Sequence, residues 1–586
     1  MLTGKKKGLV GAMAVVLAGA MIVPLLAISS ATATTRVSHA LPAPPTATPS
    51  QSNTIYTSGT MYGPPNVFNP NEQGSYATGT EGLVYETLWL YDPIKNDYIP
   101  WLAKGGAWTT PTSYKISLRS GVTWSDGTPL TATDVAFTIN LAKTDPGIYY
   151  SNLAADIASV TVNDPLTVTV NFKHVSAEDW QSFLYQDPIL PQHIMGTWSN
   201  TEMNTGSNPD PVGSGPMLVD DSLSNLTQVC YYNNPTWWAT AALGLSFKFT
   251  YLCDELNSSN NVELEDMLAG ELTLSNNFLP GIASLISSPA STGNLGGKGG
   301  YGGFLSTFYT KAPYMLSANT TWLEPNLSKF PTSNLWFRKA VAEAINTQTI
   351  VSVDYSDLVD AANPTGLMPS QSSYLDTAAV KAYGYTYDPK LAKADLAKSG
   401  YKGQKVTIEC PTGWTDWMAA EDLVAQNLKA VGINAVATFP SYTARTTDLT
   451  DGTYNFALDN NASIAADPYN YFYREFRLPI LKQQTAQDNW ERDANPAAWA
   501  LVKKLNATPM SDKSARQTIF NQLETIELQT LPEIPLWYNG AWAQYNTTHW
   551  SNWPHSGIAD DYTPVTWRGW LGNMTTVLAL AALKPV

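Results

Sequence analysis

The stretch Tyr114–Lys143, YKISLRSGVTWSDGTPLTATDVAFTINLAK, indicates how this chain folds. Apolar and polar residues alternate from Tyr114 to Arg119, which predicts a half-buried strand. A glycine-containing turn follows at Gly121–Gly127. Threonines of the kind that cap helices then precede apolar residues at helical spacing from Thr131 to Lys143. A strand, a turn and a helix in such close succession predict a mixed α/β fold.

The same alternation of strands and helices continues along the chain. Val160–Phe172 is predicted to be a hairpin that turns at Asn163–Pro165. Asn334–Ile345 and Ala419–Val431 have the apolar spacing of amphipathic helices, and the second leads into a predicted strand at Asn434–Phe439.

The N-terminal segment has the features of an export signal. Lys5–Lys7 precede an apolar stretch from Gly8 to Ile28, and the small residues at 29–33 fit cleavage after Ala33. Because the apolar stretch approaches the ~20 residues that span a bilayer, the alternative is an uncleaved membrane anchor. Residues 34–54 are rich in proline, serine and threonine and are predicted to be a flexible linker. We therefore expect an extracytoplasmic protein, in the periplasm or at the outer face of the cell membrane.

Composition narrows the class of partner. A chain of 586 residues exceeds a single hydrophobic core, which predicts two or three domains. The net charge of -15 argues against nucleic acid and anionic lipid as partners, because both require clustered lysine and arginine. Charged residues make up only 14% of the chain, against ~25% in typical soluble domains, while there are 20 tryptophans and 30 tyrosines. Binding surfaces must therefore depend on aromatic and neutral polar groups.

Cysteine and histidine usage predicts one disulfide and no metal site. Cys230 and Cys253 are the expected pair, because both end short strand-like runs, and Cys410 is then free and buried. The five histidines are scattered and lack metal-site spacing. No cofactor is predicted.

One segment near the end of the chain is rich in both tryptophan and asparagine. Ile534–Pro554, IPLWYNGAWAQYNTTHWSNWP, holds four tryptophans and three asparagines and no catalytic-looking charge. Indole rings offer flat apolar faces and amides both donate and accept hydrogen bonds, so together they match the two sides of a sugar ring. Any one tryptophan more often fills a core, but the group indicates a receptor for a flat ligand rich in hydroxyls.

A glycine-rich run at Gly293–Gly303, GNLGGKGGYGG, superficially resembles a phosphate-binding loop. Lys298 is followed by Gly299 and not by serine or threonine, and no predicted strand leads into the run. It is predicted to be a mobile surface loop.

Motifs in both halves of the chain resemble the oligopeptide-type (family 5) solute-binding proteins of ABC importers. The matching segments, in chain order, are Glu86–Leu88, Asp92-Pro93, Leu102-Ala103, Trp124–Val135, Val212–Pro216, Phe337–Ile345, Tyr387–Pro389, Gly400-Tyr401 and Leu428–Ile433. The resemblance runs from Ile55 to Val586. It implies an α/β, two-lobed periplasmic-binding-protein-like fold (class II, cluster C type) with an extra subdomain on the first lobe. It further implies a monomeric receptor that closes on its ligand, hands it to the transmembrane subunits of an ABC permease, and is not an enzyme.

The same resemblance implies a division of the chain into lobes. Lobe 1 is expected to combine residues 55–315, including a subdomain at about 92–205, with the returning segment 536–586. Lobe 2 is expected at 316–535. In this arrangement the segment Gly413–Trp417 faces Trp537–Trp542 across the cleft between the lobes.

Two features bear on the ligand. Peptide-binding members of the family hold the peptide ammonium with an aspartate three positions before an Asp/Glu-Pro step, and here Ile464 stands three positions before Asp467-Pro468. A buried ammonium without a carboxylate partner costs several kcal/mol. Cys410–Met418 (CPTGWTDWM) and Ile534–Pro554 resemble the matching segments of cello-oligosaccharide-binding members. The segments Ser275–Gly281, Ala312–Thr320 and Ala361–Gly366 resemble the same subgroup.

We therefore expect a β-linked oligosaccharide such as cellobiose, with mannan-derived sugars as the next choice. The alternative is an oligopeptide or dipeptide receptor of the same family. A secreted glycoside hydrolase is a remote alternative, because no acid lies in a recognisable hydrolase motif. The residues expected to contact the ligand, by stacking or by hydrogen bonds to hydroxyls, are Trp414, Trp417, Trp537, Trp542, Trp567, Asn276, Asn277, Asn460, Asn539 and Asp416.

Overall fold

The computed structural model describes residues 41–58, 66–72, 76–257, 259–283, 305–309, 311–484, 489–557, 562–566 and 569–586. The predicted export segment at 1–33, the glycine-rich run at 293–303 and Trp567 lie outside these residues. Leu41–Val586 form one compact unit. Among the described helices, none combines the length and the apolarity needed to cross a membrane.

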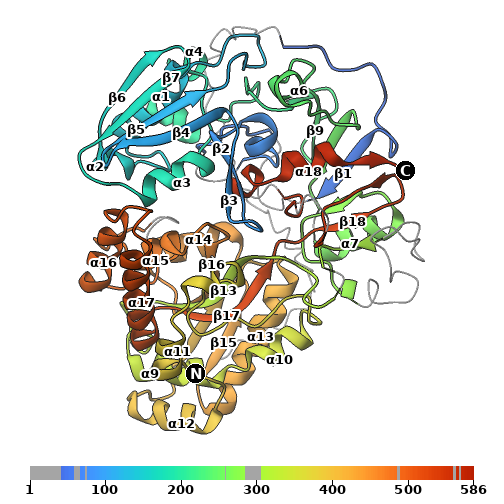
Figure 1. The fold of residues 1–586 in the computed structure, drawn as a ribbon. Helices are drawn as coiled ribbons and strands as arrows, with labels where there is room; N and C mark the ends of the chain where they lie inside the picture. Colours follow the sequence, from blue (N-terminus) through green and yellow to red (C-terminus); the bar gives the residue numbers. More distant parts are fainter. Residues whose placement is uncertain are drawn as a thin grey trace, which may run out of the picture. The chain divides into compact units, whose positions relative to one another are not determined.

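A seven-stranded sheet contains the first strand of this unit (Figure 1). Its order is β12-β18-β11-β1-β10-β9-β8. Its strands are β1 (Thr54–Ser58), β8 (Met217–Val219), β9 (Gln228–Asn233), β10 (Tyr251–Glu255), β11 (Leu274–Ser275), β12 (Leu305–Ser306) and β18 (Gln544–Asn546). Cys230 lies directly opposite Cys253 in the antiparallel pair β9/β10, and a disulfide with an S–S length of 2.06 Å joins them. Cys410 is free and buried.

A four-stranded antiparallel sheet, β4-β5-β7-β6, contains the strand predicted at Tyr114–Arg119 as β5. Its strands are β4 (Ala103–Thr110), β5 (Ser113–Leu118), β6 (Ile157–Asp164) and β7 (Thr167–Phe172). Helix α1 (Ala132–Thr144) begins with a capping box, in which Thr131 accepts from a backbone N–H of the first turn and Asp134 accepts from the N–H of Thr131. The predicted strand, helix and hairpin are therefore all present, within one to three residues at each end.

A five-stranded mixed sheet, β15-β14-β16-β13-β17, is built from the second half of the chain. Its strands are β13 (Ser317–Pro325), β14 (Val406–Glu409), β15 (Ala435–Thr438), β16 (Phe456–Ser463) and β17 (Ile534–Gly540). Because β17 pairs with β13, this sheet extends beyond residue 535, where the sequence placed the crossing between lobes.

Helices cover the five-stranded sheet (Figure 1). Helix α9 (Leu335–Ala344) agrees with the amphipathic helix predicted at Asn334–Ile345, has Asn334 as its N-cap, and packs on α12 (Pro389–Lys398). Helix α13 (Thr415–Val431) packs on β15 and starts four residues before the predicted Ala419, with Trp414 at its N-cap position.

The described fold also contains further α-helices, two short strand pairs, the π-helical segment η1 (Thr80–Val84) and the 3₁₀ helices η2 (Pro369–Tyr374) and η3 (Gly569–Asn573). The helices are α2 (Leu153–Asp156), α3 (Glu178–Gln186), α4 (Gln192–Met195), α5 (Asn200–Thr205), α6 (Trp238–Leu243), α7 (Asn260–Ala269), α10 (Thr347–Val353), α11 (Thr377–Tyr383), α14 (Tyr442–Asp451), α15 (Tyr469–Phe476), α16 (Pro496–Asn506), α17 (Lys513–Thr530) and α18 (Thr576–Ala582). The strand pairs are β2 (Trp89–Asp92) with β3 (Asp97–Pro100) and β19 (Trp550–Ser551) with β20 (Lys584–Pro585).

Most of these elements pack around one of two large apolar cores. One joins the seven- and four-stranded sheets and buries Trp124 completely. In the same core Glu86 accepts hydrogen bonds from the indole N–H groups of Trp101, Trp237 and Trp238. The other core lies mainly in the five-stranded sheet and contains Trp417, Trp537 and Trp542.

Candidate ligand-binding site

The two tryptophan-containing segments, expected to face each other across a cleft, instead pack directly together in the apolar core around the five-stranded sheet. Trp417 on α13 and Trp537 on β17 lie edge to face, with ring centroids 6.5 Å apart. Tyr355, just after α10, lies 5.3 Å from Trp537 and stacks on Trp542 at 6.2 Å. Trp414 packs edge-on against Trp417 at 4.8 Å. These five rings form one aromatic cluster.

Burial differs within the aromatic cluster. Trp537 is 0% exposed, Trp417 3% and Trp542 4%, because the neighbouring rings cover their faces. Trp414 is partly exposed and also lies 6.1 Å from the ring of Tyr442. Of the four described tryptophans in the cluster, Trp414 thus offers a ligand the most accessible surface.

Beside the cluster, one face of the strands β16, β13 and β17 is polar. Across β13 and β17, Asn319 lies opposite Asn539 and Thr321 lies opposite Trp537. Asn460 of β16 lies opposite Thr321 on the other side. Directly opposed residues in antiparallel strands point to the same face of the sheet, so these five side chains share a face. We call this set the β13–β17 polar face.

Four of the five residues of the polar face carry a buried polar atom without a hydrogen-bond partner. These atoms are Asn319 Oδ1, Thr321 Oγ1, Trp537 Nε1 and Asn539 Oδ1. Each unpaired buried group costs about 1–3 kcal/mol, and native structures rarely gather several of them. The arrangement is suited to a ligand that supplies both donors and acceptors.

The other expected contact residues already have protein partners. The amide of Asn277 donates to Glu263 at 2.7 Å. Asp416 accepts from the Tyr355 hydroxyl at 3.4 Å and lies 3.5 Å from the amide of Asn260. The amide nitrogen of Asn276 donates to the carbonyls of Trp542 and Val565, whereas its Oδ1 has no partner and is buried. Asn276 therefore retains one acceptor for a ligand.

Of the two acids beside the aromatic cluster, Asp354 is largely neutral. Burial, and then the nearby charge of Asp416, raises the pKa of Asp354 to about 8, so this acid is mostly protonated at pH 7. Burial also holds the pKa of the Tyr355 hydroxyl well above its usual value.

The position at which peptide-binding relatives place an aspartate is apolar. Ile464 is 1% exposed, and its backbone N–H donates to the carbonyl of Ala318. Asp467, three residues on, is occupied by an ion pair with Arg516 at 2.8 Å.

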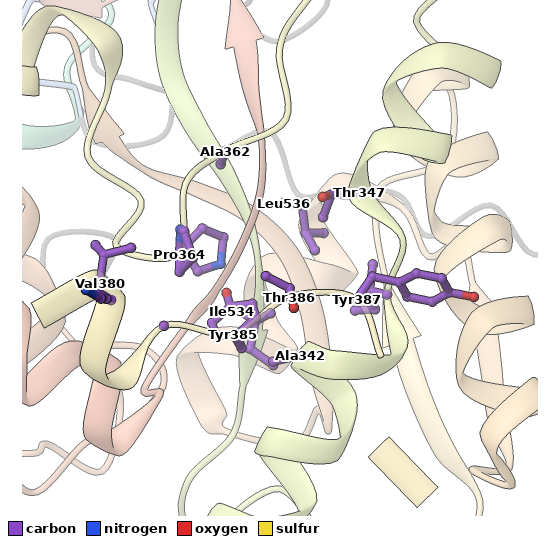
Figure 2. Close-up of a pocket in the computed structure, with 14 residues that line it drawn as sticks. Ala342, Thr347, Ala362, Pro364, Val380, Tyr385, Thr386, Tyr387, Ile534 and Leu536 are labelled. Atoms are coloured by element: carbon purple, nitrogen blue, oxygen red, sulfur yellow. The ribbon is translucent and has the colours of Figure 1, made fainter. Parts of the chain in front are cut away.

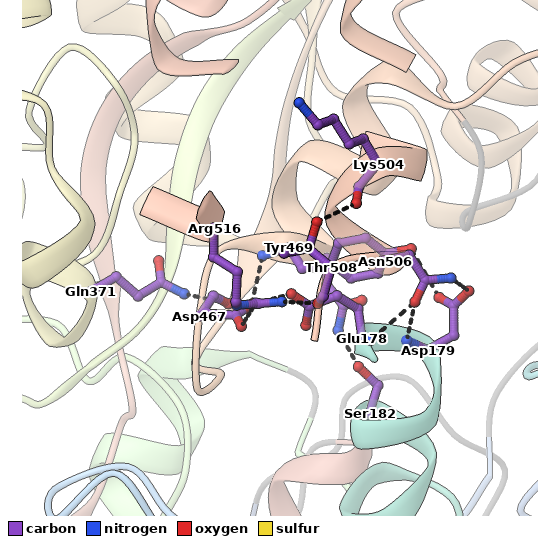
Figure 3. A network of polar contacts seen from close by, with 11 residues as sticks. Glu178, Asp179, Ser182, Gln371, Asp467, Tyr469, Lys504, Asn506, Thr508 and Arg516 are labelled. Atoms are coloured by element: carbon purple, nitrogen blue, oxygen red, sulfur yellow. Dashed lines mark hydrogen bonds and ion pairs between the residues drawn. The ribbon is translucent and has the colours of Figure 1, made fainter. Parts of the chain in front are cut away.

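That ion pair belongs to a polar network between the four-stranded-sheet region and the helices after β16 (Figure 3). Arg516 of α17 also pairs with Glu178 of α3. The amide of Asn506 donates to Asp156 and Asp179, and its oxygen accepts from the backbone N–H groups of Glu178 and Asp179. Every oxygen and nitrogen of the Asn506 side chain is thus engaged.

Two cavities lie away from the aromatic cluster. One, of about 500 Å³, is lined by Ile534, Leu536, Ala342 and Val380 with the segment 384–387 (Figure 2). Its lining combines aliphatic groups and hydroxyls with a single ionisable amine, Lys381. The second, of about 290 Å³, lies between the α3 region and α15 and is lined by aromatic and charged residues that include Tyr149 and Tyr473.

Comparison with known proteins gives the family. Residues 97–477 match the model of the bacterial extracellular solute-binding proteins, family 5 Middle. The chain belongs to this family. Its members are transport receptors and not enzymes, which agrees with the prediction from sequence and removes the glycoside hydrolase alternative.

A solved structure confirms the two-lobed α/β fold of this solute-binding protein. The mannohexaose-bound periplasmic oligopeptide-binding protein of an oligopeptide ABC transporter from Thermotoga maritima is 34% identical, with a TM-score of 0.83. The match covers 92% of this chain and 99% of that one.

Curated relatives are more distant. The probable peptide ABC transporter periplasmic-binding protein y4tO of Sinorhizobium fredii is 21% identical over 86% of this chain and 91% of its own length. The nickel-binding periplasmic protein of Escherichia coli is 22% identical over 79% of this chain and 84% of its own. The solute-binding protein is accordingly an extracytoplasmic component of an ABC importer and works with permease subunits.

Three residues of this site, Tyr355, Asn319 and Thr321, were not predicted from the sequence. Tyr355 follows an ordinary amphipathic helix, and Asn319 and Thr321 lie in a strand whose alternation alone does not reveal which face meets a ligand. Asn319 does fall within Ala312–Thr320, one of the segments that resemble the sugar-binding subgroup, and that was the available signal. Trp567 lies outside the described residues.

Proposed function

We propose that this solute-binding protein captures a neutral oligosaccharide at the aromatic cluster and the β13–β17 polar face. The observation that carries the proposal is the set of four unpaired buried polar atoms on that face. Three are acceptors or hydroxyls and one is an indole N–H, so a ligand with many hydroxyls satisfies all of them at once.

Two further observations support a neutral sugar. The position of the peptide-anchoring aspartate holds Ile464, and Asp354, one of the two acids whose charges act on Tyr355, is mostly uncharged at pH 7. The Thermotoga maritima relative, although named oligopeptide-binding, carries mannohexaose in its structure. On this basis a mannan-derived oligosaccharide stands beside cellobiose as a candidate ligand.

The second candidate is a peptide. The names of the curated relatives, peptide-binding and nickel-binding, favour this alternative over the oligosaccharide prediction. Asp416 and Asp354 lie beside Tyr355 and are the acids available to a peptide ammonium at this site.

We also propose a division into lobes that follows the sheets. Lobe 1 comprises the seven- and four-stranded sheets, and lobe 2 comprises the five-stranded sheet with its helices, ending with β17 at Gly540. The polar network of Arg516 and Asn506 then spans the two lobes, and the ligand site lies close to where the chain crosses after β17.

Isothermal titration calorimetry tests the ligand class. Purified protein is titrated with cellobiose, mannobiose, mannohexaose and laminaribiose, and separately with a mixed di- to pentapeptide library. We expect micromolar or tighter binding of at least one β-linked sugar and no heat from peptides. Binding of peptides without any sugar would overturn the proposal and establish the second candidate.

A further inference from the structure

The segment that precedes β1 is rich in proline and makes defined contacts with the rest of the chain. Leu41–Ser50 contains four prolines and forms neither helix nor strand. Figure 1 shows it in blue, running past β9 into β1. Its first residue, Leu41, packs against the apolar core that joins the seven- and four-stranded sheets. The composition of this segment predicts a flexible linker, so its contacts require a physical explanation.

Two tyrosines lie on the face of the seven-stranded sheet that is turned away from this core. Tyr232 of β9 lies directly opposite Tyr251 of β10, and Leu218 of β8 lies opposite Tyr232. Successive side chains of a strand point to opposite faces, and the neighbouring residues Tyr231 and Leu252 belong to the large core. Leu218, Tyr232 and Tyr251 form a small apolar cluster of their own. We call this cluster the tyrosine face.

The hydroxyl groups of the tyrosine face bond to backbone carbonyls of the proline-rich segment. Tyr232 donates to the carbonyl of Pro42. The hydroxyl of Tyr251 lies 2.6 Å from the carbonyl oxygen of Ala47 and 3.0 Å from that of Pro45. Although both tyrosines point away from the large core, they are only 3% and 1% exposed, which agrees with cover by the segment.

The end of the segment nearest β1 is also held in place. The amide of Asn53 donates to the carbonyl of Thr48 at 3.1 Å. The indole N–H of Trp550 donates to the carbonyl of Gln51 at 3.2 Å, and the amide of Gln51 donates to the carbonyl of Glu271 at 2.8 Å. The contacts are therefore spread along the segment and do not depend on one point.

The chemistry of proline explains why carbonyl groups make these contacts. Proline has no backbone N–H and favours the extended polyproline II conformation, whose carbonyls have no partners within the segment. Its fixed φ angle also lowers the entropy lost when the segment becomes ordered. Grooves lined with aromatic side chains are a recurrent means of binding proline-rich chains.

From this geometry we propose that the tyrosine face is a binding site for a proline-rich polypeptide and that Leu41–Thr48 occupies it as a docked strap. In the division into lobes proposed above, the strap and its partners all belong to lobe 1. A receptor held through the part of the chain before Leu41 is then fixed by lobe 1, and lobe 2 is the part that moves during closure.

Double electron–electron resonance between two spin labels tests the docking in the full chain. One label is attached at Thr46→Cys in the strap and the other at Lys115→Cys on β5, and both positions are exposed. Cys410 is buried and Cys230 is bonded to Cys253, so the native cysteines do not react. We expect a single narrow distance. A broad distribution, as a flexible linker gives, would overturn the proposal.

Tyrosine variants make the test specific. Tyr232→Phe combined with Tyr251→Phe removes both hydroxyls and should broaden the distance distribution at least threefold. Tyr231→Phe is the matched control, because this neighbour in β9 donates its hydroxyl to the carbonyl of Thr78 on the core side. The control should keep the narrow distance, and an equally narrow distance in the double variant would exclude docking through the hydroxyls. If the double variant does not fold, Tyr251→Phe alone replaces it.

Light scattering on the labelled protein identifies whose strap fills the tyrosine face. We expect a monomer. A dimer that loses its narrow distance on dilution to monomers would place the strap of a second copy on this face and overturn the assignment to the chain's own segment.

Discussion

Two polar regions of this receptor, the β13–β17 polar face and the Arg516–Asn506 network, differ in how completely their side chains are hydrogen-bonded. Asn506 engages its whole amide with Asp156, Asp179 and two backbone N–H groups. Asn539, 5% exposed, leaves its Oδ1 without a partner. An asparagine amide thus makes all of its hydrogen bonds within the protein in the network, whereas on the polar face an asparagine leaves its oxygen unpaired.

This difference in hydrogen bonding distinguishes polar groups that stabilise the fold from polar groups suited to binding a ligand. A buried amide whose hydrogen bonds are all made by the protein contributes to the free energy of unfolding. A buried amide with an unpaired oxygen lowers that free energy until a ligand supplies the missing donor. The comparison therefore predicts opposite effects of mutations in the two regions.

The largest effect is expected at Arg516. Arg516→Ala leaves Glu178 and Asp467 buried without their shared counter-charge, which should lower the free energy of unfolding by about 3–5 kcal/mol. Urea denaturation measures this loss. Lys513→Ala, at an exposed position on the same helix, is the control and should change stability by less than about 0.5 kcal/mol. Equal losses in the two variants would contradict the interpretation.

Trp537 tests the ligand side of the comparison. Trp537→Phe keeps an aromatic ring between Tyr355 and Trp417 but removes the unpaired Nε1 donor. We expect sugar affinity to fall by about 2 kcal/mol or more, measured by calorimetry. Trp414→Ala should cost a similar amount if its accessible ring also contacts the sugar. Unchanged affinity in both variants would exclude the aromatic cluster as the binding site.

The matched asparagines give the sharpest test. Asn539→Ala should lower sugar affinity by about 1–2 kcal/mol with almost no loss of stability, because its Oδ1 bonds nothing in the unliganded protein. Asn506→Ala should do the reverse and lower stability by a similar amount while affinity stays the same. Calorimetry and urea denaturation are run on both variants. Parallel losses in both properties would remove the distinction between the regions.

The smallest expected effect is a pH dependence within the network. Burial, and then the charge of Asp156, raises the pKa of Asp179 from its usual value to about 7. The folded-state pKa of Asp179 lies above its unfolded-state pKa. Its contribution to the free energy of unfolding is therefore fully present below about pH 4 and is lost as the pH rises through 7. The free energy of unfolding should therefore fall less between pH 5 and pH 8 in Asp179→Asn than in the unaltered protein. The expected difference is roughly 1 kcal/mol, because partial solvent exposure weakens the effect. An identical pH profile in the variant would show that other groups cause the fall.

Part of this molecule was predictable from local sequence alone. Thr131 and Asn334 cap their helices because serine-like and amide side chains accept the free N–H groups of a first turn, wherever the helix lies. The family motifs likewise identified a two-lobed transport receptor, and the tryptophan-rich segments identified the aromatic cluster.

Other features arose only from pairing between distant strands. Asn319 and Thr321 meet Asn539 and Trp537 through the register of β13 and β17, and a shift of one residue would turn these side chains to the other face. Tyr232 and Tyr251 likewise bond to the carbonyls of Pro42 and Pro45, which are remote from them along the chain. The sequence thus determined the class of protein and the chemical character of its binding residues. Only the tertiary structure decided which buried polar groups remain unpaired, because pairing depends on neighbours that are remote along the chain.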